Sequence, residues 1–288
     1  MATDTISVED LAQVQNVEFT LRFAENVSNL LAVLGVSESV PMALGTQLEI
    51  YKTSGALKSG TGIAEGEDIP ISHYENKLDR TITLDFEKWR KQTTIEAIAK
   101  RGYTQAVTKT DNKMVKDIQM GVRNTFYNFL KSGTGTAGGD TFQAALANAW
   151  GTLEIKFEDT SATPVYFVNP MDIADYLGKA TVSLQSAFGF SYIENFLGLG
   201  TVLVDSKVTQ GSVIATAQEN INVYHVDPGA IPGFDFYSDE TGLIGIHHDT
   251  RYQNVAYETI AVSAFTLFPE YLDRIVIADI TGEETPEP

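Results

Sequence analysis

The stretch that decides the fold is residues 46–86, which opens with TQLEIYK (46–52), continues with TSGALKSGTGIAEGEDIP (53–70) and returns as LDRTITLDF (78–86). The opening and returning segments alternate apolar and polar residues, which is typical of strands. About 25 polar and glycine-rich residues join them, whereas most connections in a compact domain are a handful of residues long. Such an arm is either disordered or completed by something outside its own subunit, and the second option favours an assembly protein.

A long amphipathic helix is predicted after this excursion. The segment TIEAIAKR (94–101) is expected to be a short helix closed by Gly102, and Thr108 to Asp111 resembles a capping box that opens the longest helix of the chain, ending near Lys131. The apolar stripe of the long helix consists of Met114, Val115, Ile118, Val122, Phe126 and Phe129. A helix of this length spans about 30 Å, so we expect it to be the spine of the fold.

The remaining segments predict an α+β chain with two lobes. The first 35 residues follow helical spacing and end at Gly35, and residues 132–140 (SGTGTAGGD) are expected to be a flexible linker before a helix that starts at Thr141. Residues 160–239 are expected to form a compact α/β unit. Strands are expected at 164–168, 201–204, 212–216, 221–226, within 242–268 as a pair, and at 274–280, followed by a disordered acidic tail, 283–288.

Composition excludes several classes of protein. The chain has 288 residues, of which 43% are hydrophobic, so it is globular and long enough for about two domains. It has no cysteine, which excludes disulfides, thiolate metal sites and a cysteine nucleophile. No apolar run approaches the ~20 residues that a membrane helix needs. The net charge of −18 disfavours a protein that grips nucleic acid by its phosphates.

The charges are unevenly distributed along the chain. Residues 77–131 hold 12 of the 20 Lys and Arg but only six of the 38 acids, whereas residues 48–76 hold two lysines and five acids. Either these are solvated faces, or the acidic arm of one copy lies on the basic region of another. The second hypothesis predicts inter-subunit contacts by Lys52, Lys58, Glu65, Glu67, Asp68, Lys88, Arg90, Lys91, Lys113 and Lys116.

No catalytic, cofactor-binding or metal-binding site is predicted, and the chain is not expected to be an enzyme. Residues 133–138 (GTGTAG) match a dinucleotide-binding pattern, but they follow a helix and place Asp140 where an anion would bind, so a linker is the better interpretation. His247 and His248 are adjacent, so on a strand they point to opposite faces and cannot readily share a metal. No G-x-S-x-G elbow accompanies the scattered Ser, His and Asp residues.

Several stretches together resemble the major capsid proteins of tailed bacteriophages, the fold typified by phage Hong Kong 97. The layout of arm, excursion, spine helix and inserted α/β lobe has the order seen in that family. The stretches that carry the resemblance are RFAENVSNLLAVLGV (22–36), LGTQLEIYK (44–52), TKTDNKMVKDIQMGV (108–122), PVYFVNPMDIADYLGKA (164–180) and GLGTVLVDSKVTQGSVIATAQENINVYHV (198–226).

The resemblance implies a Hong Kong 97-like major capsid fold with a definite division of the chain. The implied parts are an N-terminal arm and helix (1–45), an extended loop (46–89), a peripheral domain with the spine helix (90–159 and 240–282), an inserted axial domain (160–239) and a disordered tail (283–288).

The function implied by the resemblance is that of a structural subunit of an icosahedral head, assembled in the host cytoplasm and located in the virion. It would form hexamers and pentamers that enclose a packaged double-stranded DNA genome. A separate scaffolding protein and a portal protein are implied as partners, and a decoration protein is allowed; no membrane, cofactor or sequence-specific nucleic acid is implied. Two alternatives stay open. One is an encapsulin-like compartment shell, and the other is a soluble α/β hydrolase or binding protein, which leaves the acidic arm unexplained.

Overall fold

The computed structural model of the chain describes residues 8–36, 39–43, 45–58, 61–62, 68–158, 162–177, 184–187, 190–238 and 240–281, with side chains of the first helix described from residue 18 onward. The chain divides into two compact units. One contains residues 1–42 and 86–288, here called the body, and the other contains residues 43–85, here called the arm. Each unit is described by itself.

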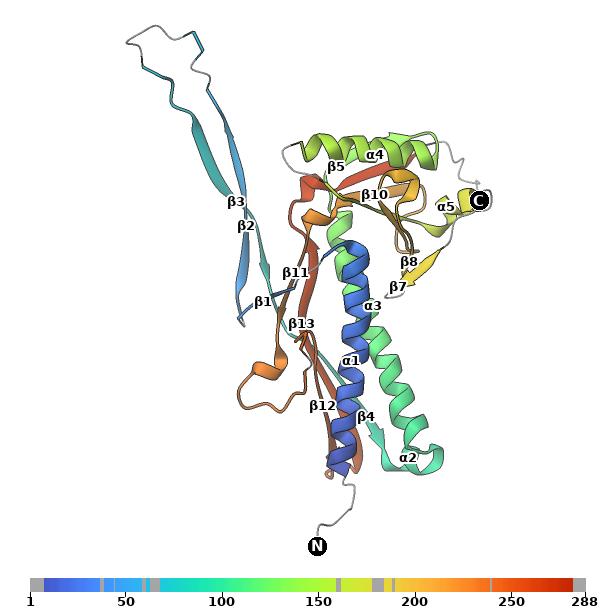
Figure 1. Cartoon of the computed structure of the whole chain (residues 1–288). Helices are drawn as coiled ribbons and strands as arrows, with labels where there is room; N and C mark the ends of the chain where they lie inside the picture. Colours follow the sequence, from blue (N-terminus) through green and yellow to red (C-terminus); the bar gives the residue numbers. More distant parts are fainter. Residues whose placement is uncertain are drawn as a thin grey trace. The chain divides into compact units, whose positions relative to one another are not determined.

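Two long helices lie against one sheet of the body (Figure 1). Helix α1 (Val8–Leu34) runs unbroken and ends where Gly35 adopts a φ of +73°, a conformation that costs glycine little. Helix α3 (Lys109–Lys131) follows a short π-helical turn, Thr104–Thr108. The predicted stripe is confirmed in its centre, because Val115, Ile118, Val122 and Phe126 are buried; Met114 and Phe129 are half-buried. The spine helix is not the longest, since α1 has 27 residues and α3 has 23.

The predicted capping box at the start of α3 is wrong. Thr108 is already helical (φ −59°, ψ −43°), and its side chain caps nothing, because the π-helical turn leads into α3 without a break. Asp111 is buried and pairs with groups on the sheet. A capping box requires an extended first residue, and a preceding helical turn removes that condition. Helix α2 (Ile95–Arg101), by contrast, ends as predicted at Gly102, which has a φ of +77°, and the side chain of Thr94 caps its start.

The five-stranded sheet of the body is built around β13 (Ala256–Pro269). The first half of β13 pairs antiparallel with both β12 (Gly245–Arg251) and β4 (Glu87–Thr94). Its second half pairs antiparallel with β11 (Ile221–Val226). The short strand β1 (Val40–Pro41) pairs in parallel with the other edge of β11. Two expectations are corrected here. Residues 87–89 belong to β4 and not to the excursion, and β11 belongs to this sheet and not to the α/β unit.

The second sheet has seven strands in the order β5-β14-β10-β6-β9-β8-β7, with α4 (Phe142–Lys156) and α5 (Pro170–Leu177) packed beside it. Its strands are β5 (Gly135–Gly139), β6 (Pro164–Val168), β7 (Gln185–Ala187), β8 (Phe190–Ile193), β9 (Thr201–Val204), β10 (Ser212–Ala217) and β14 (Val276–Ile280). Short 3-10 turns occur at Phe196–Gly198, Gln218–Asn220, Pro228–Ala230 and Leu272–Arg274.

The glycines of residues 132–140 pack closely and do not form the predicted flexible linker. Residues 132–140 include strand β5, which pairs in parallel with β14. A Cβ on Gly135 would lie 2.6 Å from the carbonyl oxygen of Ile275, and a Cβ on Gly139 would lie 2.3 Å from the backbone nitrogen of Ala145. Glycine is needed here because two backbones approach each other, and the same composition that suggests a linker serves that approach equally well.

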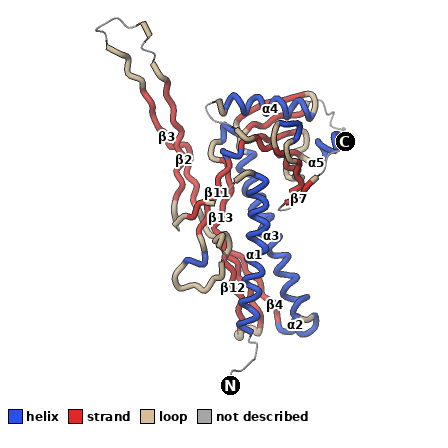
Figure 2. The backbone as a smooth tube through the Cα atoms, viewed as in Figure 1, coloured by secondary structure: helices blue, strands red, loops and turns tan. Residues whose placement is uncertain are grey.

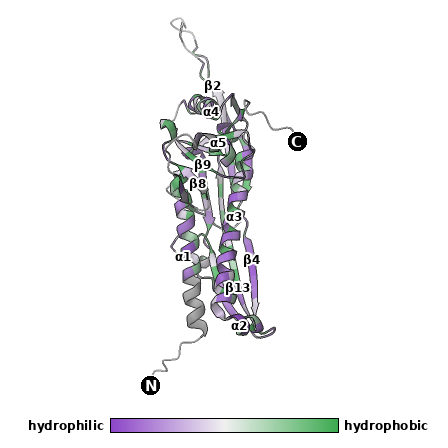
Figure 3. Cartoon of the chain, turned by 90° about the vertical axis from the view of Figure 1, so that its right-hand side faces the viewer, coloured by the Kyte–Doolittle hydropathy of each residue, from purple (hydrophilic) through white to green (hydrophobic). Residues whose placement is uncertain are grey.

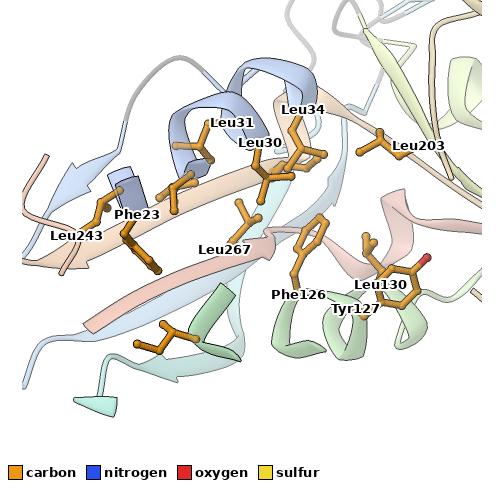
Figure 4. Close-up of a cluster of buried hydrophobic side chains, with 14 of the residues drawn as sticks. Phe23, Leu30, Leu31, Leu34, Phe126, Tyr127, Leu130, Leu203, Leu243 and Leu267 are labelled. Carbon is orange, nitrogen blue, oxygen red and sulfur yellow. The ribbon is translucent and has the colours of Figure 1, made fainter. Parts of the chain in front are cut away.

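The seven-stranded sheet separates two hydrophobic cores. Along β6, Val165 and Phe167 belong to the core shared with α1 and α3, whereas Tyr166 and Val168 belong to the core beneath α4 and α5. Alternate residues of a strand face opposite sides, so a strand buried on both faces is apolar throughout. The ring of Phe126 on α3 meets that of Phe167 edge to face, with centroids 5.7 Å apart. Figure 4 shows the first core, where side chains of both long helices converge.

The described part of the arm consists of one antiparallel pair of strands and contains no helix (Figure 2). Strand β2 (Gln47–Ala56) pairs with β3 (His73–Thr83), with an irregularity between Ile50 and Tyr51. Both strands extend further into the excursion than predicted, so the connection comprises residues 57–72 and is shorter than expected. Sequence patterns underestimate the length of such strands, because an exposed two-stranded ribbon needs backbone hydrogen bonds but no apolar face.

Candidate functional site

The far end of the hairpin carries large apolar side chains that its own unit does not cover. Leu57, Ile69 and Ile71 are 78%, 74% and 85% exposed, and the neighbouring Tyr74 is also exposed. Among the described residues of the arm only Ile50 and Leu84 are buried apolar residues. A two-stranded hairpin is at best marginally stable in water by itself. The arm therefore presents several large apolar side chains that the described residues leave exposed.

The predicted charged contacts of the arm are exposed wherever the structure describes them. Lys52 on β2, Lys58 after it and Asp68 before β3 all lie at the surface. Glu65 and Glu67 lie outside the described residues. The backbone nitrogen of Lys58 donates a 3.0 Å hydrogen bond to Ser72 Oγ, so the chain is still held across the hairpin just beyond the last strand pair.

In the body, Arg90 is held by an acid of the same chain. Arg90 on β4 donates two hydrogen bonds to the carboxylate of Glu258 on β13, of 2.8 and 2.7 Å, and Gln92 donates a third of 2.6 Å. Arg251 on β12 adds a contact of 3.4 Å. The hydrogen bonds from Arg90 lower the pKa of Glu258 to about 2, although burial alone would raise it. The cluster joins three strands on the sheet face that α3 does not cover.

Lys91, the next residue along β4, is also paired within the chain. Its ammonium lies 2.5 Å from Oδ1 of Asp111 on α3, and Thr259 of β13 donates a 3.1 Å hydrogen bond to the same oxygen. His248 Nε2 lies 3.5 Å from the other carboxylate oxygen. Burial raises the pKa of Asp111, but the hydrogen bonds from His248 and Lys91 outweigh it, so the net shift is downward. This cluster fastens α3 to three strands.

The other predicted contacts lie on α3 and β4. Lys88 is exposed on β4, a strand that is hydrophilic along its length (Figure 3). Lys113 forms an ion pair with Asp117 one turn further along α3. Lys116 lines a groove between α1 and α3. Arg90 and Lys91 are thus neighbours on one strand, but each forms an ion pair with an acid of the same chain. Lys88 and Lys116 remain accessible. Their role between subunits stays a prediction.

Sequence reasoning missed the acids that receive these cations. Asp111 was assigned to a helix cap, and Glu258 was not singled out. The available signal was that Glu258 is the sole acid among the 14 residues of β13, an apolar strand where an unpaired charge would be costly. The partner of that acid could not be inferred, because no strand was predicted at residues 87–94.

The described residues contain no cluster suited to metal binding. No group of three or more His, Asp or Glu side chains is placed to hold a metal ion there. His247 and His248 face opposite sides of β12 as predicted: Nδ1 of His247 lies 2.8 Å from the carbonyl oxygen of Asp235, whereas His248 is buried beside Asp111. Within the described part of the chain, no helix combines the length and apolar character required to span a bilayer.

Comparison by sequence finds no relative: no protein family matches the chain, and no curated protein is significantly similar to it. Comparison by structure finds shell proteins. The capsid of cyanophage A-1(L) matches with a TM-score of 0.56 and 10% identity, over 88% of this chain and 93% of the cyanophage chain. The capsid of an empty GTA particle matches with a TM-score of 0.55 and 11% identity, over 88% and 90% of the two chains.

The SrpI encapsulin of Synechococcus elongatus also matches, with a TM-score of 0.52 and 12% identity, over 89% of this chain and 90% of the encapsulin chain. At such low identities these likenesses establish the fold. The chain has the α+β Hong Kong 97-type capsid fold, as the sequence predicted.

Proposed function

We propose that the chain is the major capsid protein of a tailed bacteriophage, a structural subunit of the icosahedral head and not an enzyme. The observation that carries this proposal is the match to the cyanophage capsid over 88% of this chain and 93% of the other, which leaves little of either chain outside the shared fold. Copies of the subunit assemble into hexamers and pentamers that enclose the packaged double-stranded DNA. The acidic character of the chain suits such a shell, because packaged DNA should not adhere to its wall.

The arm is proposed as the element that joins neighbouring copies. Its exposed Leu57, Ile69 and Ile71 need a surface to cover them, and a second copy provides one in a closed shell. Apolar contact at the end of the hairpin adds to the electrostatic attraction expected of Glu65, Glu67 and Asp68. Exposed ion pairs contribute only ~0–1 kcal/mol each, so the apolar residues supply the larger share of the binding energy.

We also propose a revised division of the body into a peripheral and an axial domain. The seven-stranded sheet with α4 and α5 forms one core, and it includes residues 135–157 and 276–280 in addition to most of residues 160–217. The axial domain is therefore assigned to this sheet and its helices. The peripheral domain is assigned to α3 and the five-stranded sheet around β13, including β4 and β11.

Several partners and a location complete the proposal. A separate scaffolding protein guides assembly in the host cytoplasm, a portal protein occupies one vertex, and the mature subunit resides in the virion. A decoration protein is a further partner on the outside of the shell. These assignments rest on the capsid fold.

Electron microscopy of particles isolated from their natural source, combined with nuclease protection, tests the proposed function. We expect closed icosahedral particles that protect double-stranded DNA of genome length. Closed shells that contain protein cargo and no DNA would instead identify a compartment of the encapsulin kind. A soluble monomer that forms no particle would contradict both.

A further inference from the structure

One histidine of β11 anchors the segment that leads from α1 to the arm. Ser39 Oγ lies 2.8 Å from Nδ1 of His225. The backbone nitrogen of Met42 donates a 2.8 Å hydrogen bond to the carbonyl oxygen of the same histidine. Between these two contacts, Pro41 pairs with His225 in the parallel register of β1 and β11 (Figure 1). The side chain and the backbone of His225 thus hold residues 39–42, here called the arm root.

The attachment of the arm root is short and lies at the surface. Strand β1 has two residues, Val40–Pro41, and proline has no N–H to donate to a sheet. Val40 is 47% exposed, and Pro41 is exposed as well. Segments with few buried contacts open locally at a low cost in free energy, while the rest of the fold stays intact. Weakening the contacts of His225 should therefore release the arm root without unfolding either sheet of the body.

The imidazole of His225 is buried close to the carboxylate of Asp227. His225 is 7% exposed, and burial lowers its pKa, although attraction to Asp227 opposes the shift. The carboxylate is also engaged by its own turn, because Oδ1 of Asp227 accepts hydrogen bonds of 2.8 Å from the backbone of Gly229 and 2.6 Å from Ser238 Oγ. The closed arm root therefore favours the neutral imidazole.

Three residues that flank His225 from other segments carry no titratable group. The residue paired with His225 on β13 is Phe265, and the one paired with it on β1 is Pro41. Gly242 approaches the ring on the side of Nε2, because a Cβ on this glycine would lie 3.4 Å from that atom. Within the described part of the chain, Asp227 is thus the charged group that acts on the ring. A change at the arm root between pH 7.5 and 5.5 would therefore report on His225 itself.

We propose that His225 is an acid-sensitive latch for the arm root. Near neutral pH the uncharged ring holds Ser39 and keeps residues 39–42 on β11. As the pH falls below about 6.5, the ordinary value for histidine, protonation favours an opened state in which the ring reaches water. The arm begins at residue 43, so release of the four root residues lengthens its tether to β11 by up to about 13 Å. The inference concerns the isolated chain and does not depend on the proposed function.

Hydrogen exchange at the Met42 amide of the isolated chain tests the latch, after correction for the intrinsic effect of pH on exchange. We expect its protection to fall at least about threefold between pH 7.5 and 5.5, because each pH unit below the ordinary pKa favours the opened state by up to about tenfold. In His225→Gln, whose side chain does not titrate, protection should be nearly independent of pH. The matched control is His247→Gln on β12, where Nδ1 of the histidine lies 2.8 Å from the carbonyl oxygen of Asp235; it should retain the pH dependence of the wild type.

A second variant keeps the test decisive if His225→Gln folds poorly. Ser39→Ala removes the hydroxyl beside Nδ1 and leaves the buried imidazole in place, so protection of Met42 should already be below that of the wild type at pH 7.5. The amide of Phe167 on β6 reports on global unfolding and should stay protected. Three outcomes would overturn the proposal: protection of Met42 in the wild type that does not change with pH, a pH dependence that His225→Gln shares with the wild type, or parallel loss of protection at Phe167.

Discussion

At the scale of single residues, the chain uses several of its basic residues to hold itself together. Arg90 and Lys91 are neighbours on β4, yet they point to opposite faces of the sheet, where Glu258 and Asp111 receive them. Each acid is buried and each accepts more than one hydrogen bond. A run of positive charge in the sequence therefore does not by itself indicate an interface, because the folded chain pairs some of these charges internally.

Glu258 predicts a defined pH dependence of stability. Its pKa is about 2 in the folded chain against an ordinary 4.5, so the ionised carboxylate stabilises the fold fully above 4.5, and this contribution is lost as the pH falls toward 2. The free energy of unfolding of Glu258→Gln, measured with denaturant, should be below that of the wild type near neutral pH, and the difference should shrink between about pH 5 and about pH 3. Glu87→Gln, at an exposed acid of β4, should differ little from wild type at either pH. A difference for Glu258→Gln that stays constant over this range would show that the ion pair is not the source.

Phe126 tests the assignment of the buried face of α3. Its side chain is 1% exposed and packs against Phe167. Phe126→Ala should lower the free energy of unfolding by about 3–5 kcal/mol, because it removes buried apolar surface and leaves a cavity. Phe129→Ala, at a half-buried position of the same helix, should cost clearly less. Thermal unfolding monitored by circular dichroism compares the two, and equal losses would mean that the helix face is misassigned.

At the scale of elements, the sequence predicted what local patterns encode. The helix that ends at Gly35, the helix between Thr94 and Gly102 and the buried strand of residues 164–168 were all predicted, because periodicity and caps lie within the segment itself. The strands β4 and β5 were missed. β4 consists mostly of charged and polar residues whose partners lie far away in sequence, and β5 is almost all glycine and alanine. Such segments become strands because they pair with neighbouring strands, and a single sequence does not show which segments pair.

The glycines of β5 provide a test at this scale. A Cβ on Gly139 would lie 2.3 Å from the backbone of α4, whereas a Cβ on Gly151, within α4, meets nothing within 4 Å. Gly139→Ala should therefore lower the melting temperature by forcing β5 and α4 apart. Gly151→Ala should raise the free energy of unfolding by roughly 0.5–1 kcal/mol, because alanine favours the helix. A flexible linker at residues 132–140 would instead tolerate Gly139→Ala without any loss.

At the scale of the whole molecule, the arm distinguishes a shell subunit from a self-contained domain. Both hydrophobic cores found among the described residues lie in the body, as do the five-stranded and seven-stranded sheets. The arm has a ladder of backbone hydrogen bonds and several exposed apolar residues at its end. The sequence of the excursion indicated this division, because a polar and glycine-rich segment between two strands cannot form a hydrophobic core of its own. The extent of its strands and the residues at its apolar end emerged only with the pairing of β2 and β3.

Sedimentation velocity of the full chain and of a variant with a shortened arm tests the central claim most directly. In the variant, residues 57–72 are replaced by Asn-Gly, a turn that suits the antiparallel strands β2 and β3, so the body should fold and melt as in the full chain. With its assembly partners supplied, the full chain should sediment as closed shells and the variant as free subunits or small oligomers. Shells of normal size from the variant, or a stable monomer from the full chain, would contradict the account.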